Sequence, residues 1–68
     1  MTIKITLNGT GQEFEASMTL DALARDLGLD PRKVAIERNH AVVPKSAYDT
    51  TPVEDGDCFE IVQFVGGG

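Results

Sequence analysis

One apolar stripe with helical spacing sets the limits on what this chain can fold into. Over residues 20–27, apolar side chains recur at i, i+3, i+4 and i+7, which predicts one short helix with a single buried face. Thr19 is placed to cap the first turn, Asp21 complements the helix dipole, and Gly28 can end the helix. No other stretch predicts a convincing helix, so the remaining core of the 68 residues must come from strands.

The first residues have the alternation of a strand with one buried face. Within residues 2–7, Ile3, Ile5 and Leu7 point one way and polar side chains point the other. The sequence Asn-Gly-Thr-Gly at 8–11 then predicts a hairpin turn, because Asn and Gly both tolerate positive φ. Residues 12–17 should return antiparallel to the first strand, with Phe14 and Ala16 facing the core.

Three more strands are predicted in the second half of the chain. They are expected at 34–38, 41–43 and 58–65, with single helical turns after Asp30 and around Tyr48 between them. The last strand is long and apolar, which favours a central place, with Phe59 and Ile61 facing the core and Glu60 facing outward.

This order of elements predicts an α+β fold of the β-grasp type, with a mixed sheet of about five strands wrapped over one helix. The first and last strands should lie parallel at the centre of the sheet. We expect residues 1–65 to form the β-grasp domain and residues 66–68 to form a flexible C-terminal Gly tail.

The final glycines predict where the chemistry takes place. Gly66 and Gly67 carry no side chain and could thread a channel one backbone wide, since three extended residues reach roughly 10 Å. The carboxylate of Gly68 is then the reactive group, although a carboxylate is a poor electrophile that a partner must activate. A frayed terminus or a linker remnant would have the same composition. Val62, Phe64 and Val65, just before the glycines, are expected to dock on partners, because the strand should run out of core there.

Charge and cysteine content exclude several classes of function. A net charge of -5 argues against binding nucleic acid or an anionic membrane and favours a basic protein partner. A single cysteine cannot form an internal disulfide, which fits a cytoplasmic protein, and no signal peptide or membrane-length apolar run is present.

Several motifs together resemble a known family, the sulfur carrier proteins of thiamine biosynthesis (ThiS), which have a ubiquitin-like β-grasp fold. The most specific are the run VAIERN at residues 34–39 and the ending FVGGG at 64–68, and the resemblance spans essentially the whole chain. Thr-Leu-x-x-Leu at the helix start, Val43-Pro44 and the Asp-Gly-Asp turn at 55–57 also match. His40 and Cys58 depart from the family pattern, but neither touches the tail.

The resemblance implies a reaction cycle in which this chain is a protein cosubstrate and not a catalyst. It implies that an adenylyltransferase of the ubiquitin-activating type uses ATP and Mg²⁺ to convert the Gly68 carboxylate to an acyl adenylate. Sulfur from a cysteine desulfurase persulfide, or from another donor, then displaces AMP and gives a thiocarboxylate. Thiazole synthase takes the sulfur from this thiocarboxylate. The chain itself should bind no cofactor.

Other candidate sites are interpreted as structural. Cys58 has no His or cationic neighbour in sequence to activate its thiol, and His40, expected on the surface of a hairpin turn, lacks partners at metal-ligand spacing. Five carboxylates are interpreted as helix caps, turn residues and solvated charges: Asp21, Asp26, Glu54, Asp55 and Asp57.

Alternatives within and beyond this class stay open at this stage. A MoaD-like small subunit of molybdopterin synthase or a tRNA-thiolation carrier would share the fold and a Gly-Gly end. A ubiquitin-like protein modifier would instead be joined to lysines. A non-covalent binding module would tolerate loss of the last two glycines.

Overall fold

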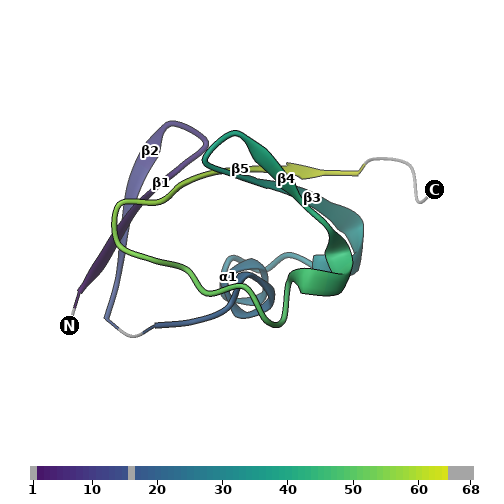
Figure 1. Cartoon of the computed structure of the whole chain (residues 1–68), viewed down its shortest axis with the longest axis horizontal. Coiled ribbons are helices and arrows are strands. Elements are labelled where there is room, and N and C mark those ends of the chain that lie inside the picture. Colours follow the sequence, from purple (N-terminus) through teal and green to yellow (C-terminus); the bar gives the residue numbers. More distant parts are fainter. Residues whose placement is uncertain (1, 16, 65–68) are drawn as a thin grey trace.

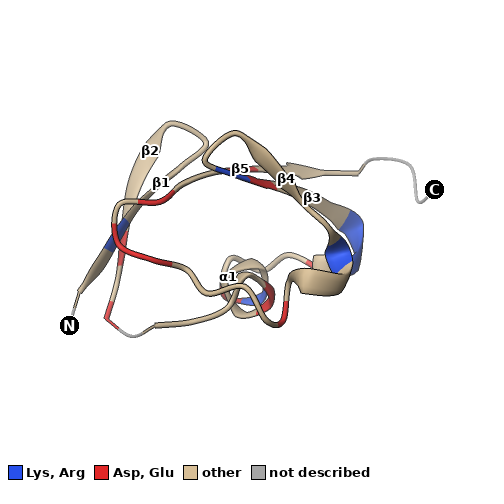
Figure 2. Cartoon of the chain, viewed as in Figure 1, with Lys and Arg blue, Asp and Glu red and all other residues tan. Residues whose placement is uncertain are grey.

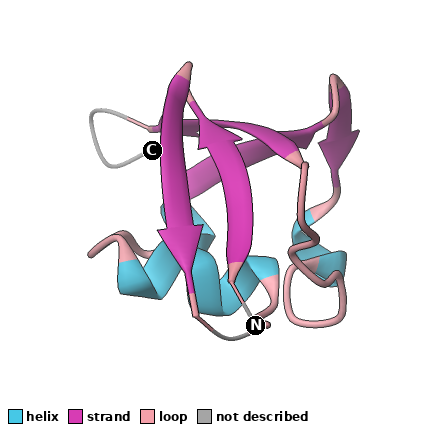
Figure 3. Cartoon of the chain, turned by 90° about the vertical axis from the view of Figure 1, so that its left-hand side faces the viewer, coloured by secondary structure: helices cyan, strands magenta, loops and turns pink. Residues whose placement is uncertain are grey.

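The computed structural model describes residues 2–15 and 17–64 of the chain. Five strands form one sheet in the order β2-β1-β5-β3-β4, and the helix α1 lies across one face of it (Figures 1 and 3). This arrangement confirms the predicted mixed β-grasp sheet over a single α-helix. The elements are β1 (Ile3–Leu7), β2 (Thr10–Phe14), α1 (Leu20–Asp26), the 3-10 turn η1 (Pro31–Lys33), β3 (Val34–Arg38), β4 (Ala41–Val43), the 3-10 turn η2 (Lys45–Ala47) and β5 (Cys58–Gln63).

The first hairpin is tighter than its sequence suggested. Asn8 and Gly9 have φ values of 49° and 83° and alone form the loop, so that Thr10 already pairs with Leu7. Two consecutive positive φ values give the twist of a type I′ turn, which brings the returning strand into register at once. The strand predicted at 12–17 therefore lies earlier in the chain: β2 begins at Thr10 and ends at Phe14. Ala16 lies outside the described residues.

The core forms between α1 and the inner face of the sheet. Three side chains of α1 that the sequence pattern selected are buried: Leu20, Leu23 and Ala24. The hydroxyl of Thr19 accepts a hydrogen bond from the Ala22 N–H at 3.3 Å, and Gly28 has a φ of 80°, which confirms both predicted helix ends. Burying these side chains removes the apolar stripe of the helix from water, which stabilises the fold. The sheet contributes buried side chains at Ile3, Ile5, Val34, Ile36, Phe59 and Ile61.

The strand β5 is the centre of the sheet. It runs parallel to β1, with Cys58 opposite Thr6, and antiparallel to β3, with Gln63 opposite Val34. The Phe64 N–H donates to the Lys33 carbonyl at 2.9 Å, which extends the contact with the β3 side by one residue. The predicted end of this strand at residue 65 is not reached within the described residues, because β5 ends at Gln63.

Two short turns close the helix side of the molecule. The Asp30 carboxylate caps η1 by accepting from the Arg32 N–H at 2.9 Å, and hydrogen bonds from the Arg32 side chain and backbone lower the pKa of Asp30 to about 2. The buried Tyr48, which follows η2, donates its hydroxyl proton to the Val34 carbonyl at 3.2 Å and accepts from the Ile36 N–H at 3.1 Å. Both predicted turns are confirmed, and Tyr48 ties the second of them to β3.

Candidate docking surface at the end of β5

The described part of the predicted site is exposed at the end of the central strand. Val62 and Phe64 keep 61% and 52% of their surface accessible, and Val42 on β4, at 75%, is the third exposed large apolar side chain among the described residues. An exposed aromatic ring next to a chain end fits the expected docking role, which stays a prediction. Val65 and the three glycines, Gly66, Gly67 and Gly68, lie outside the described residues.

Phe64 contacts Lys45 through its ring and Lys33 through its backbone. The Lys45 Nζ atom lies 4.7 Å from the centroid of the Phe64 ring, a cation–π distance, and also donates to the Arg32 carbonyl at 2.7 Å. Lys33 meets Phe64 through the backbone hydrogen bond that extends β5. These contacts fix the start of the terminal segment relative to β3 while leaving about half of the Phe64 surface accessible.

The open face of the sheet around Val62 is partly acidic. Val62 lies opposite Ala35, and two register positions away, on the same face, Glu60 lies directly opposite Glu37. Directly opposed like charges destabilise a strand pair, so this position is not optimised for the stability of the isolated sheet. The acidic pair borders the apolar Val62 on the face opposite α1.

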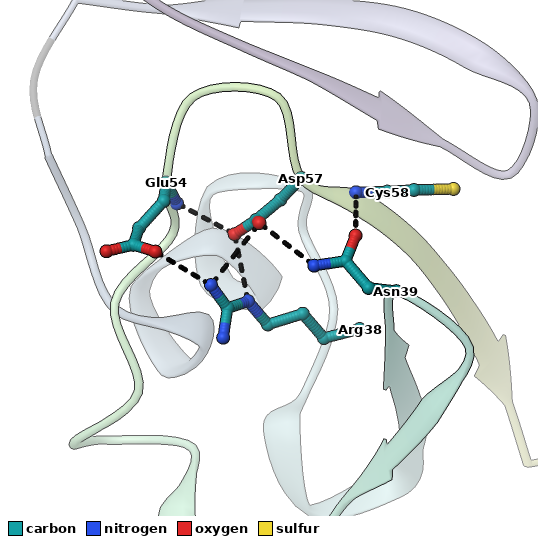
Figure 4. A network of polar contacts seen from close by, with 5 residues as sticks. All are labelled: Arg38, Asn39, Glu54, Asp57 and Cys58. Atoms are coloured by element: carbon teal, nitrogen blue, oxygen red, sulfur yellow. Dashed lines mark hydrogen bonds and ion pairs between the residues drawn. The ribbon is translucent and has the colours of Figure 1, made fainter.

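A polar network fixes the beginning of β5 (Figure 4). The Arg38 guanidinium donates to Asp57 from Nε at 2.9 Å and from Nη2 at 3.3 Å, and Nη2 also reaches Glu54 at 2.9 Å. Asn39 donates from Nδ2 to Asp57 at 3.2 Å, while its Oδ1 accepts from the Cys58 N–H at 2.9 Å. The network therefore joins the end of β3 to the first residue of β5.

Asp57 corrects one interpretation made from the sequence. It does lie in the predicted polar turn, but it is not solvated, since only 6% of its surface is exposed. Burial raises the pKa of Asp57, but hydrogen bonds from Arg38, from the Glu54 N–H and from Asn39 outweigh it and hold that pKa below its ordinary value. No sequence signal identified this pair, because the two charges are far apart along the chain.

A second asparagine holds the other edge of β5 beyond the end of β1. The Ile61 N–H donates to Asn8 Oδ1 at 2.9 Å, and Asn8 Nδ2 donates to the Ile61 carbonyl at 3.1 Å. The side-chain amide takes the place of a peptide group in the ladder, so backbone groups of β5 stay paired where β1 has already turned away. β5 is thereby ordered almost up to the residues of the predicted docking surface.

The other candidate residues carry no site in the described structure. His40 is exposed in the turn between β3 and β4, as expected, and Cys58 is half-buried. Within residues 2–15 and 17–64, no three His, Cys, Asp or Glu side chains gather in a way that could hold a metal ion. An open groove of about 280 Å³ lies by η1 and η2 and is lined by Asp21, Pro31, Arg32, Lys45, Ser46, Tyr48 and Asp49. In the same two segments, no helix has both the length and the apolar character needed to cross a membrane.

Comparison with known proteins places this geometry in a family. Residues 5–68 match the model of the ThiS family. The sulfur carrier protein ThiS of Bacillus subtilis is 34% identical over 65 residues, covering 94% of this chain and 98% of that protein. A crystal structure of a thiamine biosynthesis protein (ThiS) from Geobacter metallireducens superimposes with a TM-score of 0.82 at 32% identity, covering 97% of this chain and all of that one.

Two further relatives are much longer proteins. Thiazole synthases of Paramagnetospirillum magneticum and Magnetococcus marinus are 54% and 46% identical to this chain over 66 residues. These matches cover 97% of this chain, which spans only about a fifth of the length of each thiazole synthase. Together, the family match and the superposition confirm the resemblance that the sequence motifs indicated.

Proposed function

Because this chain belongs to the ThiS family, we propose that it is a sulfur carrier of thiamine biosynthesis whose Gly68 carboxylate is the group that is charged and unloaded. The observation that carries the proposal is the place of β5. The central strand is held on both edges, and the chain continues from it through the exposed Phe64 into a terminus without side chains. A partner can therefore take up the end of the chain without disturbing the core.

The proposed chemistry begins with activation by a partner. A Gly68 carboxylate oxygen attacks the α-phosphorus of ATP on an adenylyltransferase of the ubiquitin-activating type, which uses Mg²⁺ and releases pyrophosphate. The adenylate has AMP as a good leaving group, which the carboxylate lacks. In this proposal the carrier is a cosubstrate, and the adenylyltransferase supplies the site for this step.

Sulfur transfer then replaces AMP. The terminal sulfur of a persulfide, supplied by a cysteine desulfurase or a similar donor, attacks the carbonyl carbon, and AMP departs. A thiol cleaves the resulting acyl disulfide, which leaves a thiocarboxylate on Gly68 and a disulfide on the donor side. Keeping sulfur covalently bound in this way prevents its loss as free sulfide.

Thiazole synthase is the proposed acceptor of this sulfur. Two proteins of that name contain a segment similar to this whole chain within a single polypeptide, which supports a partnership between the two activities. In this proposal Gly66 and Gly67 lie in the partner's channel, Val62, Phe64 and Val65 dock at its mouth, and the cycle runs in the cytoplasm.

Intact mass spectrometry tests the proposal. The purified chain is incubated with ATP, Mg²⁺, the adenylyltransferase and a persulfide donor, and we expect a mass increase equal to the exchange of one oxygen for sulfur, located at Gly68 by fragmentation. Omission of ATP is the control. An unchanged mass under complete conditions contradicts the proposal, and recovery of lysine adducts from cells would favour a protein modifier instead.

A genetic test separates thiamine synthesis from the other thiolation pathways. A deletion strain should require thiamine or its thiazole precursor for growth, and the gene for this chain should restore growth without either. A strain that instead loses molybdopterin or tRNA thiolation would assign the carrier to the alternative pathway.

A further inference from the structure

The cations of this acidic protein are distributed unevenly. Of its six Lys and Arg residues, four form ion pairs with carboxylates: Lys4 with Glu13, Arg25 with Asp21, Arg32 with Asp30, and Arg38 with Asp57 and Glu54. Lys33 and Lys45 form none among the described residues. Lys33 contacts Phe64 through its backbone carbonyl and Lys45 through its ammonium group, so the end of β5 combines an exposed aromatic ring with two lysines that have no carboxylate partner among the described residues. Figure 2 shows basic residues in blue where β3 begins, on the same side of the molecule as the end of β5.

We propose that Lys33 and Lys45 form a basic rim that docks on carboxylates surrounding the opening in the adenylyltransferase that receives the tail. This inference rests on the proposed function and specifies the chemistry of the partner surface. Charge complementarity supports this proposal: in a chain with a net charge of -5, the two lysines that lack a carboxylate partner among residues 2–15 and 17–64 both contact Phe64, the residue that follows β5. Ammonium groups around an apolar anchor favour an acidic rim around an apolar pocket.

The ATP phosphates are the obvious alternative target, and geometry argues against them. Gly68 lies four residues beyond Phe64, which is roughly 13 Å when the chain is extended. The α-phosphate must be at the Gly68 carboxylate during adenylation, whereas Lys45 is held at the Phe64 ring, with its Nζ 4.7 Å from the ring centroid. The basic rim therefore faces the entrance of the channel and not the nucleotide.

The distribution of charges along the chain gives this inference a matched control in the same molecule. The double variant K33Q/K45Q changes the net charge from -5 to -7 by removing two positive charges, and K4Q/R25Q makes the same change in charge away from Phe64. Circular dichroism and urea unfolding check that both variants fold, and K33Q alone, which keeps the Lys45 contacts, serves as a second test.

The readout is the kinetics of pyrophosphate release by the adenylyltransferase. For K33Q/K45Q we expect KM for the carrier to rise about tenfold with kcat little changed, and the difference should shrink at high salt. K4Q/R25Q should change KM less than twofold, and K33R/K45R, which keeps the charges, should restore the wild-type value.

Three results would overturn the inference. Equal KM values for the two double variants would show that the basic rim does not contribute to docking. A KM increase that persists unchanged in high salt would exclude an ionic contact. A loss in kcat at unchanged KM would indicate that the lysines act on the reacting groups. Absence of pyrophosphate release by the wild-type chain would overturn the proposed function and this inference with it, whereas the three results above leave the proposed function standing.

Discussion

Asn8 and Asn39 occupy equivalent positions in two hairpin turns, and each directs its side-chain amide onto β5 from an opposite edge. Asn8 has a φ of 49° and bonds both backbone groups of Ile61, and Asn39 has a φ of 51° and accepts from the Cys58 N–H. A residue in this position needs a left-handed backbone and a side chain with both donor and acceptor, which Asn supplies. The two turns thus support the strand that leads to the terminus.

Replacing Asn8 by Gly should lower the free energy of unfolding by about 1–2 kcal/mol, because two partly buried hydrogen bonds to Ile61 are lost while the positive φ is kept. Urea unfolding measures this loss, and the amide proton of Ile61 should exchange with solvent faster than in the wild type. The variant Gly9→Ala is a useful comparison, because it strains the same turn without touching the amide pair. An Asn8→Gly protein with wild-type stability would contradict a supporting role for Asn8.

Replacing His40 by Gly should stabilise the protein. His40 is exposed and has a φ of 71°, a conformation that costs a residue with a Cβ atom about 1–2 kcal/mol. We expect a gain of about 1 kcal/mol and a rise in Tm of about 4–8 °C, measured by thermal unfolding. The neighbouring variant Asn39→Gly should destabilise instead, since it removes the bonds to Asp57 and Cys58. A lower free energy of unfolding for His40→Gly would show that the imidazole stabilises the fold by more than the backbone strain at positive φ costs.

The buried ion pair should make stability depend on pH. The pKa of Asp57 is lower in the folded chain than in the unfolded chain, so the pair stabilises the fold above about pH 4 and this stabilisation is lost as the pH falls through the folded pKa. Asp57→Asn should cost about 2–3 kcal/mol at pH 7, because Arg38 loses its buried partner and keeps only the exposed Glu54, and should flatten the acid limb of the stability curve. Urea midpoints between pH 2.5 and 7 measure both effects, and an equally steep acid limb in the variant would assign the dependence to other carboxylates.

Phe64→Ala should weaken docking with little effect on folding. About half of the ring is exposed, so we expect a loss of stability below about 1 kcal/mol but an increase in KM for adenylation of about tenfold or more. Val42→Ala on β4 is the control, because Val42 is even more exposed but belongs to an edge strand. Similar kinetics for Phe64→Ala and the wild type would show that the ring serves the fold alone.

Gly67→Val should abolish charging of the terminus. A branched side chain at this position would fill a channel that admits only backbone, so thiocarboxylate should fall below detection in the mass assay while urea unfolding matches the wild type. Deletion of Gly68 should have the same effect. Efficient thiolation of the valine variant would exclude a narrow channel.

Local patterns in the sequence predicted most of the fold. The stripe at 20–27 with Thr19 and Gly28 predicted α1, and alternation in the first residues predicted β1, since both depend on interactions between neighbours in sequence. The length and apolar content of the last strand predicted its central place beside β1. Errors occurred at element ends, such as the early start of β2 at Thr10, where turn geometry decides the register.

Contacts between distant residues were not predictable in this way. Asp57 resembled any acidic turn residue, and only the fold brings Arg38 to it. Likewise, the net charge of -5 predicted a basic partner for the whole chain, whereas the fold leaves two lysines, Lys33 and Lys45, beside Phe64. A local charge environment depends on which strands become neighbours, and composition carries no information about that.

The central place of β5 also has a mechanical consequence. Because β1 and β3 are hydrogen-bonded to its two edges, a pull exerted on the terminus acts along the strand axis and loads many bonds in shear at the same time. Bonds loaded together resist far better than bonds that open one after another. We therefore expect that partners can bind and release the terminus of this carrier repeatedly without unfolding it.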